Sequence, residues 1–264
     1  MTMMDYGFMK NALLAVLLIT PMFAILGTMV VHKRMAYFSD ALGHSALTGI
    51  AVGVLFGFRD ATVSMVIFGI VFALVLNQIK FRNLLSADTV ISVFASFSMA
   101  VGLAVLSKGG SFSNYSAMLV GDILSITVPE IIGLLVILVF TVIFWIFAVN
   151  SLNAISVSPV LARSRHMKVN LMENVFAVLI AVIVMLSIKW VGILLISALL
   201  ILPAAASRNI AENMREYHIY ALIFSVFSGV VGLISSYFAN VATGPMIAVV
   251  ASVIFFGTYF KGKQ

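Results

Sequence analysis

The strongest constraint on the fold is a series of long apolar runs joined by short charged connections. A helix needs about 20 mainly apolar residues to cross a bilayer, so each run is close to the length of one crossing. The chain is therefore predicted to be an all-α polytopic membrane protein with about nine transmembrane helices. Eight is the alternative, because the run 191–206 is short. The runs cover residues 11–31, 35–57, 61–79, 88–107, 129–149, 171–188, 191–206, 219–239 and 244–260.

Composition supports a membrane protein and removes several kinds of chemistry. The chain is 63% hydrophobic and 9% charged, whereas soluble domains are roughly 25% charged. It has no cysteine, so a metal site must use nitrogen or oxygen ligands. The net charge of +6 is assigned to loops that face lipid at the membrane surface, and no nucleic-acid partner is expected. The first run is too long for a signal peptide and is interpreted as a retained span.

Basic residues orient the predicted spans, because positive charge gathers in cytoplasmic loops. If the connection 150–170 is cytoplasmic and nine runs alternate, 11 of the 15 basic residues lie inside and 4 outside. The N-terminus is then outside and the C-terminus in the cytoplasm. The inside residues are Lys33, Arg34, Lys80, Arg82, Arg163, Arg165, Lys168, Arg208, Arg215, Lys261 and Lys263, and the outside ones are Lys10, Arg59, Lys108 and Lys189.

The run 35–57 carries ionisable side chains although it has the length of a span. Asp40 and His44 are four residues apart, so a helix places them on one face, and Thr48 continues that face. Ionisable groups at membrane depth usually face a polar path or a partner. Two interpretations remain open. The pair lines such a path, or Asp40 caps the helix at the water interface while His44 packs.

A stripe of small residues runs beside that face. Ser45, Gly49, Gly53 and Gly57 follow one another at every fourth position, as in G-x-x-x-G helix contacts. Small side chains let a second helix backbone approach closely. The stripe therefore predicts a helix-packing edge next to the polar face.

Polar residues also mark both ends of the predicted bundle. In the connection 150–170, Ser158 is a predicted N-cap with Pro159 at the first helical position, which indicates a short cytoplasmic helix. On the outer side, Asp122 and Glu130 either guide a cation at the entrance or cap short helices. The sequence has no G-x-x-x-x-G-K-[ST], H-E-x-x-H or G-x-S-x-G motif. The chain is therefore expected to be a transport subunit and not an enzyme, with ATP hydrolysis on a separate chain.

Several strings in order resemble a known family. They are RMAYFSDALGHSALTG, LVGDILSITVPE, SVSPVLA, VGILLISALLILPAAASR and ATGPMIAVV. Together they resemble the membrane permeases of bacterial ABC transporters that import zinc or manganese, over nearly the whole chain. One departure concerns the residues after S-P-x-L-A, where members often have a glycine. Here the sequence from Arg163 to His166 and on to Met167 fills that region.

The resemblance implies an assembly and a location. Such permeases are homodimers in the bacterial cytoplasmic membrane, and residues 1–264 would form a single permease domain. Each copy sits on a cytoplasmic ATP-binding subunit and receives metal from an extracytoplasmic metal-binding protein. The helix after Ser158 then resembles the coupling helix that docks into the ATPase. The coupling residues are Ser158, Pro159, Val160, Leu161 and Ala162.

Twofold symmetry would bring two copies of the polar face together. Two Asp40 carboxylates and two neutral His44 imidazoles form a four-ligand set suited to tetrahedral zinc, with Thr48 as an additional oxygen. Ligation needs a deprotonated imidazole, so uptake should weaken below about pH 6.5, the ordinary His pKa. The cargo is zinc or manganese, and the strings look closer to zinc-type members; no permanent cofactor is expected. The alternative function is a gradient-driven metal transporter or channel with Asp40 and His44 as a relay.

Overall fold

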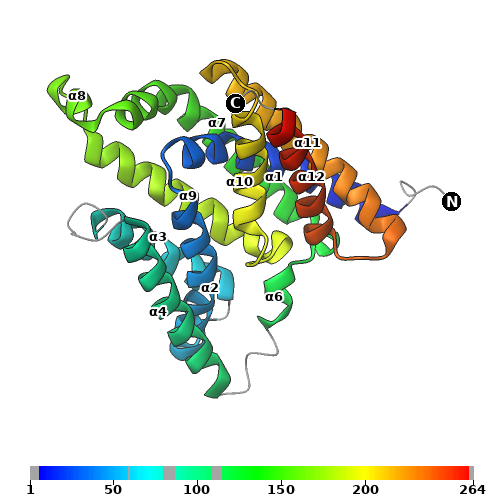
Figure 1. Cartoon of the computed structure of the whole chain (residues 1–264). Helices are drawn as coiled ribbons and strands as arrows, with labels where there is room; N and C mark the ends of the chain where they lie inside the picture. Colours follow the sequence, from blue (N-terminus) through cyan, green and yellow to red (C-terminus); the bar gives the residue numbers. More distant parts are fainter. Residues whose placement is uncertain (1–5, 59, 80–86, 109–114, 262–264) are drawn as a thin grey trace. The chain divides into compact units, whose positions relative to one another are not determined.

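The computed structural model of the chain describes residues 6–58, 60–79, 87–108 and 115–261. All regular structure in these ranges is helical, which confirms the predicted all-α fold, and eight helices are long and apolar enough to cross a membrane. The predicted positions of Arg59, Lys80, Arg82 and Lys263 lie outside the described residues. The eight helices, labelled in Figure 1, are α1 (Gly7–His32), α2 (Ala36–Phe56), α3 (Ala61–Ile79), α4 (Ala87–Lys108), α7 (Val128–Val157), α9 (Val169–Val191), α11 (Met214–Ala239) and α12 (Thr243–Lys261).

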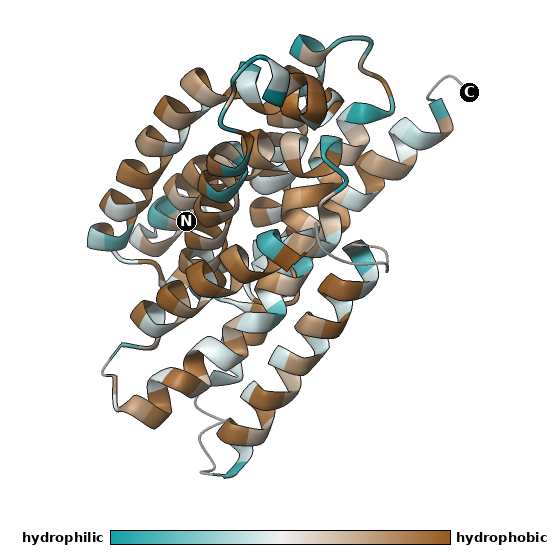
Figure 2. Ribbon diagram, turned by 90° about the vertical axis from the view of Figure 1, so that its left-hand side faces the viewer, coloured by the Kyte–Doolittle hydropathy of each residue, from teal (hydrophilic) through white to brown (hydrophobic). Residues whose placement is uncertain are grey.

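Among the described residues, four shorter helices lie between them. They are α6 (Ala117–Val120), η2 (Ile123–Ser125), α8 (Pro159–Ser164) and α10 (Ile196–Arg208). Figure 2 shows that apolar residues dominate the long helices and that hydrophilic residues concentrate at turns and helix ends. Helix α7 presents large apolar side chains outward, such as Phe147 at 79% exposure, which suits a surface that faces lipid.

Helix α7 extends further than the sequence predicted, because it continues to Val157 instead of ending at 149. The polar residues after the apolar run do not stop a helix. Ser158 does, since it precedes Pro159 and the proline ring disfavours helical geometry at the residue before it. The backbone restriction, and not the end of hydrophobicity, therefore sets this boundary.

The chain divides into two compact units, each built from separate segments. Unit 1 comprises Met1–Arg34, Val120–Ile146 and Lys189–Gln264, and unit 2 comprises Met35–Leu119 and Phe147–Ile188. Helix α7 contributes to both units. The single permease domain expected over residues 1–264 stays a prediction.

Unit 1 contains α1, α10, α11 and α12, which pack against one another. Close contacts between these helices occur where a glycine, which has no side chain, faces the neighbouring helix. Gly27 of α1 lies directly against the Leu200 carbonyl of α10. Gly229 of α11 lies against Thr20 of α1, where an added Cβ would come within 2.6 Å of the threonine methyl carbon. Ser225 Oγ donates to the Thr20 carbonyl at 2.9 Å and strengthens the same contact.

Helix α10 has 13 residues and is shorter than each of the eight candidate spans, but the segment that contains it extends as far as α12. A Cβ added at Gly244, at the start of α12, would lie 3.0 Å from the Val191 carbonyl oxygen. At the other end of α12, Thr258 Oγ1 accepts from Asn209 Nδ2 at 3.2 Å. Residues 191–209 therefore run between the same two ends of unit 1 as α12, a 19-residue candidate span.

Within unit 2, α2 packs against both α3 and α4. Helix α9 approaches α3 at Gly69, where an added Cβ would lie 2.7 Å from two atoms of the Met185 side chain. Near the end of α3, Asn77 Nδ2 donates to Asn174 Oδ1 of α9 at 2.7 Å. Unit 2 thus places α3 in contact with α2 and with α9.

Candidate metal-binding, entrance and coupling sites

The polar pair on α2 adopts the geometry that its spacing predicts. His44 Nε2 lies 3.5 Å from Asp40 Oδ2, one helical turn away. The Asp40 side chain is 50% exposed and that of His44 is 29% exposed, while His44 Nδ1 is buried and has no hydrogen-bond partner in the part of the chain that the structure describes. The pair can therefore present a carboxylate oxygen and an imidazole nitrogen at one open edge of α2.

One copy of the chain does not complete a metal site at this edge. Among the described residues, no three His, Asp or Glu side chains gather closely enough to hold a metal ion. Zinc in proteins normally has three or four protein ligands, and the pair supplies two. Any metal held here needs further ligands from water or from another copy of α2.

Thr48 is oriented toward α4 and is buried. Its hydroxyl donates to the Ser98 carbonyl and accepts from Ser98 Oγ at 3.0 Å. Gly102 makes the approach possible, since a Cβ there would lie 2.6 Å from the Thr48 backbone nitrogen. In this arrangement Thr48 fastens α2 to α4, and its role as a metal ligand stays a prediction. Sequence reasoning missed Ser98 and Gly102, although their four-residue spacing is itself a small-x-x-x-small signal.

The residues of the small-residue stripe on α2 do not share one role. Gly49 and Gly53 meet α3, where Ser64 Oγ donates to the Gly49 carbonyl at 2.8 Å. Ser45 is fully buried and donates to the Leu42 carbonyl of its own helix. The packing role expected for Gly57 is wrong. Gly57 ends α2 in the left-handed conformation at φ +69°, and no atom of the described residues lies within 4 Å of the position of its Cβ.

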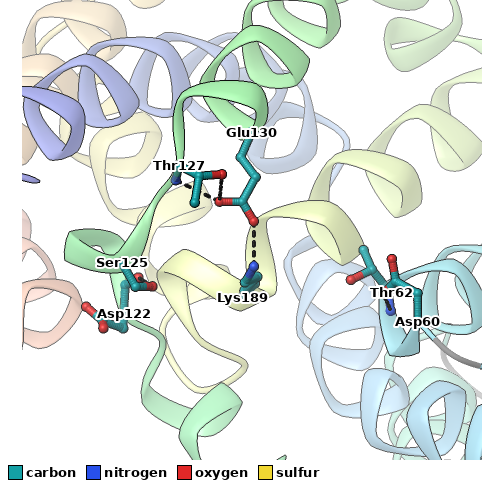
Figure 3. A network of polar contacts seen from close by, with 7 residues as sticks. All are labelled: Asp60, Thr62, Asp122, Ser125, Thr127, Glu130 and Lys189. Carbon is teal, nitrogen blue, oxygen red and sulfur yellow. Dashed lines mark hydrogen bonds and ion pairs between the residues drawn. The ribbon is translucent and has the colours of Figure 1, made fainter.

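Both candidate entrance residues accept hydrogen bonds at helix starts, and Figure 3 shows the contacts of Glu130 with Thr127 and Lys189. Asp122 Oδ1 accepts from the Leu124 amide at 3.0 Å and caps η2. Glu130 Oε2 accepts from the amide and the hydroxyl of Thr127, each at 2.8 Å, at the start of α7. Glu130 Oε1 lies 2.5 Å from Lys189 Nζ, a partner that sequence reasoning did not identify. The capping interpretation fits these contacts, and a gating role stays a prediction.

Three glycines from separate strings meet beside this ion pair in unit 1. Gly121 and Gly192 both have positive φ, at +75° and +92°. A Cβ on Gly121 would lie 2.5 Å from the Val191 carbonyl carbon, and one on Gly244 would lie 3.4 Å from the Val120 carbonyl oxygen. The Asp122 amide also donates to the Lys189 carbonyl at 3.2 Å. The segments LVGD, VGIL and ATGP therefore meet at one place, where their backbones lie in direct contact. We call this contact between the three segments the glycine crossing.

The short helix α8 begins as predicted. Ser158 Oγ accepts from the Leu161 amide at 3.3 Å, and Pro159 is the first helical residue. Ala162 is 3% exposed and belongs to a small core with Ile155 and Val169, whereas Leu161 is 64% exposed. Val160 is also exposed. The helix is thus held by one face and offers an apolar face outward.

The end of α8 explains the departure from the expected glycine. His166 adopts the left-handed conformation at φ +57°. The Met167 amide donates to the Ala162 carbonyl at 3.1 Å and the His166 amide to the Arg163 carbonyl at 2.9 Å. These two bonds define a Schellman motif with His166 at the position that glycine usually occupies.

The membrane-length helices, the polar pair within one of them and the exposed short helix together define a membrane transport permease. Residues 5–262 match the profile of the ABC 3 transport family, and the chain belongs to this family. The expected resemblance to ABC-transporter permeases is confirmed, and so is the expectation of a transport component rather than an enzyme.

Relatives and solved structures match nearly the whole chain. The high-affinity zinc uptake system membrane protein ZnuB of Haemophilus influenzae is 31% identical over 96% of this chain and 97% of its own length. The manganese import system permease protein ScaB of Streptococcus gordonii is 27% identical over 97% of this chain and 92% of its own. The structure of PsaBC from Streptococcus pneumoniae in complex with Fab has the same fold, with a TM-score of 0.85 at 24% identity over 97% of this chain and 92% of that chain.

Proposed function

We propose that the chain is the permease subunit of an ATP-driven importer of divalent transition metal, with zinc as the preferred cargo. The observation that carries this proposal is the Asp40–His44 pair, which puts an oxygen and a nitrogen ligand 3.5 Å apart on a membrane-length helix. Full-length similarity to a zinc uptake protein supports the choice of metal.

The pair forms a complete site when two copies of α2 meet across a twofold axis. Two carboxylates and two imidazoles give the four ligands of a tetrahedral zinc ion, and two negative charges balance the cation. Balanced charge makes burial tolerable, whereas an unpaired charge would be costly. A changed geometry between outward and inward states then releases the metal. Thr48 joins the site only if its contact with Ser98 opens.

The partners follow from the two membrane faces of the proposed topology. The exposed apolar face of α8, including Val160 and Leu161, suits docking into a cytoplasmic ATP-binding subunit. An extracytoplasmic metal-binding protein delivers the ion to the opposite side, where Asp122 and Glu130 lie in the proposed topology. The assembly belongs in the bacterial cytoplasmic membrane.

Uptake by the reconstituted permease and its ATPase tests the proposal. Asp40→Ala and His44→Ala should each lower zinc uptake by more than about ten-fold, because even supporting groups of a metal site cost 10–100-fold when lost. Asp88→Ala removes an exposed carboxylate at the start of α4, outside the polar pair, and should transport normally. Normal uptake by Asp40→Ala and His44→Ala in assembled complexes would show that α2 only packs.

The cargo and the energy source need separate measurements. Imidazole with carboxylate binds zinc more tightly than manganese, so zinc should compete effectively with manganese for uptake. Preference for manganese would overturn the choice of metal but not the transport function. Uptake that proceeds without ATP in a proton gradient would instead favour the gradient-driven alternative, with Asp40 and His44 as a relay.

A further inference from the structure

Unit 2 contains both the helix with the polar pair and the helix with the exposed docking face. Helices α2, α3 and α4 belong to it together with α8 and the greater part of α9. The contacts inside this unit therefore determine whether a displacement of α8 reaches α2. Three successive contacts connect them.

The first contact joins α8 to α9. Ala162 of α8 packs with Val169, the first residue of α9, and with Ile155 of α7. Met167 and Met172 cover this core. Because well-packed interiors deform little, the start of α9 should move with α8.

The second contact joins α9 to α3 through two amide side chains. Asn77 Nδ2 donates to Asn174 Oδ1 at 2.7 Å, and the Asn77 side chain is nearly fully buried. Asn77 Oδ1 is buried as well and has no hydrogen-bond partner among the described residues. Two facing amides can exchange two hydrogen bonds, and this pair makes one of them here.

The half-satisfied amide is not explained by packing alone. An apolar side chain would avoid leaving a buried acceptor without a donor, which is costly in a membrane protein. Polar groups kept within membrane helices at such a cost usually have a role in function. The spare acceptor gives Asn77 a second hydrogen bond to form when α9 and α3 shift relative to each other.

The third contact joins α3 to α2. Ser64 Oγ donates to the Gly49 carbonyl at 2.8 Å, and a Cβ on Gly49 would lie 2.8 Å from Met65 Cα. The backbones of α2 and α3 are so close at this contact that one helix cannot slide along the other unless the two first move apart. Movement of α3 is therefore passed to the helix that carries Asp40 and His44.

We propose that the Asn77–Asn174 hydrogen bond is a coupling contact that transmits displacement of α8 and α9 through α3 to α2. Asn77 and Asn174 are positioning residues in this role, since neither belongs to the polar pair. The proposal rests on the proposed function, because it assumes that an ATPase moves α8.

The test measures metal transported per ATP hydrolysed by the permease–ATPase complex in proteoliposomes. Asn77→Leu keeps a similar side-chain volume and removes the amide. It should lower the metal transported per ATP by about three-fold, which corresponds to the free energy of a typical hydrogen bond between membrane helices. ATP hydrolysis itself should continue. Asn174→Leu should have the same effect, and the double variant should be no worse than either single one. Ser187→Ala is the matched control and should keep the wild-type ratio, because it removes a buried hydroxyl of α9 that has no hydrogen-bond partner among the residues the structure describes.

Each outcome separates the inference from the proposed function. If wild-type complexes transport no metal, the proposed function fails before the variants are compared. If wild type transports and both leucine variants keep the full ratio, the coupling contact is wrong while the importer stands. A merely structural role would lower assembly, uptake and ATP hydrolysis together and leave the ratio unchanged, which also overturns the inference. Additive losses in the double variant would show that the two amides act separately.

Discussion

His166 closes α8 in a conformation that costs most residues free energy. Its φ of +57° lies in the left-handed region. The steric contact between side chain and backbone in that region costs about 1 kcal/mol or more of free energy. His166→Gly should therefore leave the fold unchanged and raise the free energy of unfolding by up to about 1 kcal/mol. His166→Val should lower it by about 1–2 kcal/mol, because β-branched residues tolerate this region least. Thermal unfolding of the purified protein in detergent measures both changes.

The same substitution one residue earlier is the control. Arg165 has φ −87°, which any residue adopts, so Arg165→Gly gains nothing and loses backbone entropy. It should be neutral or destabilising. A stabilising effect of Arg165→Gly as large as that of His166→Gly would show that the left-handed position is not the cause.

Gly192 tests the glycine crossing of unit 1. Its φ is +92°, and a Cβ there would meet the Val120 carbonyl group and lie 2.8 Å from the Gly121 amide nitrogen. Gly192→Ala should destabilise the protein by about 2 kcal/mol or more, since strain and backbone overlap act together. Gly133→Ala in α7 is the matched control, because no atom of the described residues lies within 4 Å of the added Cβ, and it should be neutral or stabilising by up to about 1 kcal/mol. Equal stability of the two variants would contradict the crossing.

The sequence predicted the role of a residue correctly where that role depends on residues close by in the chain. Ser158 was recognisable as an N-cap because Pro159 follows it, and Gly49 and Gly53 as packing residues from their spacing. Gly57 was assigned wrongly, because the stripe continues past the point where the helix ends. The partner of Thr48 could not be predicted, since Ser98 lies 50 residues away and nothing local specifies the pairing.

At the scale of elements, apolar runs predicted the helices better than their ends. The predicted run 61–79 coincides with α3, while α7 extends to Val157 and α10 begins only at Ile196. Run length reflects the thickness of the bilayer, whereas helix ends depend on backbone limits such as Pro159 and Gly192. The contact between the three glycine-containing segments could not be predicted from any one of them. Each segment supplies only one side of the contact, and the segments are far apart in the sequence.

The contact between the start of α7 and Lys189 carries the next prediction. Glu130 both pairs with Lys189 and accepts from the Thr127 amide, so one side chain has two separable roles. Lys189→Glu should destabilise the protein by about 1 kcal/mol, given that the pair is partly exposed. Adding Glu130→Lys should restore the ion pair but not the cap at Thr127. The double variant should therefore be less stable than wild type in thermal unfolding.

Uptake by one further variant, Glu130→Gln, distinguishes capping from gating. Capping alone predicts that Glu130→Gln keeps a normal KM for metal, since the amide oxygen still accepts from Thr127. A raised KM with unchanged stability would support the gate at the entrance. Full recovery of stability in the double variant would contradict a separate capping role.

At the scale of the whole molecule, the number of crossings decides the orientation of the termini. An odd number puts them on opposite sides and an even number on the same side. With nine crossings, 11 basic residues lie inside and 4 outside. If residues 191–209 did not cross, Arg208, Arg215, Lys261 and Lys263 would move outside, leaving 7 inside and 8 outside. The charge bias would then vanish, so the positive-inside rule and the shared ends of α10 and α12 both favour a ninth crossing.

Single cysteines can test this topology cleanly, because the chain has none of its own. Ser125→Cys and Glu212→Cys place thiols at exposed positions on either side of the segment 191–209 within unit 1. In spheroplasts, a membrane-impermeant maleimide should label Ser125→Cys at once and Glu212→Cys only after the membrane is permeabilised. A reporter fused after Gln264 should be active in the cytoplasm. Labelling of both cysteines in sealed spheroplasts would show that α10 does not cross, and a C-terminal reporter active outside would reverse the orientation of the final helix.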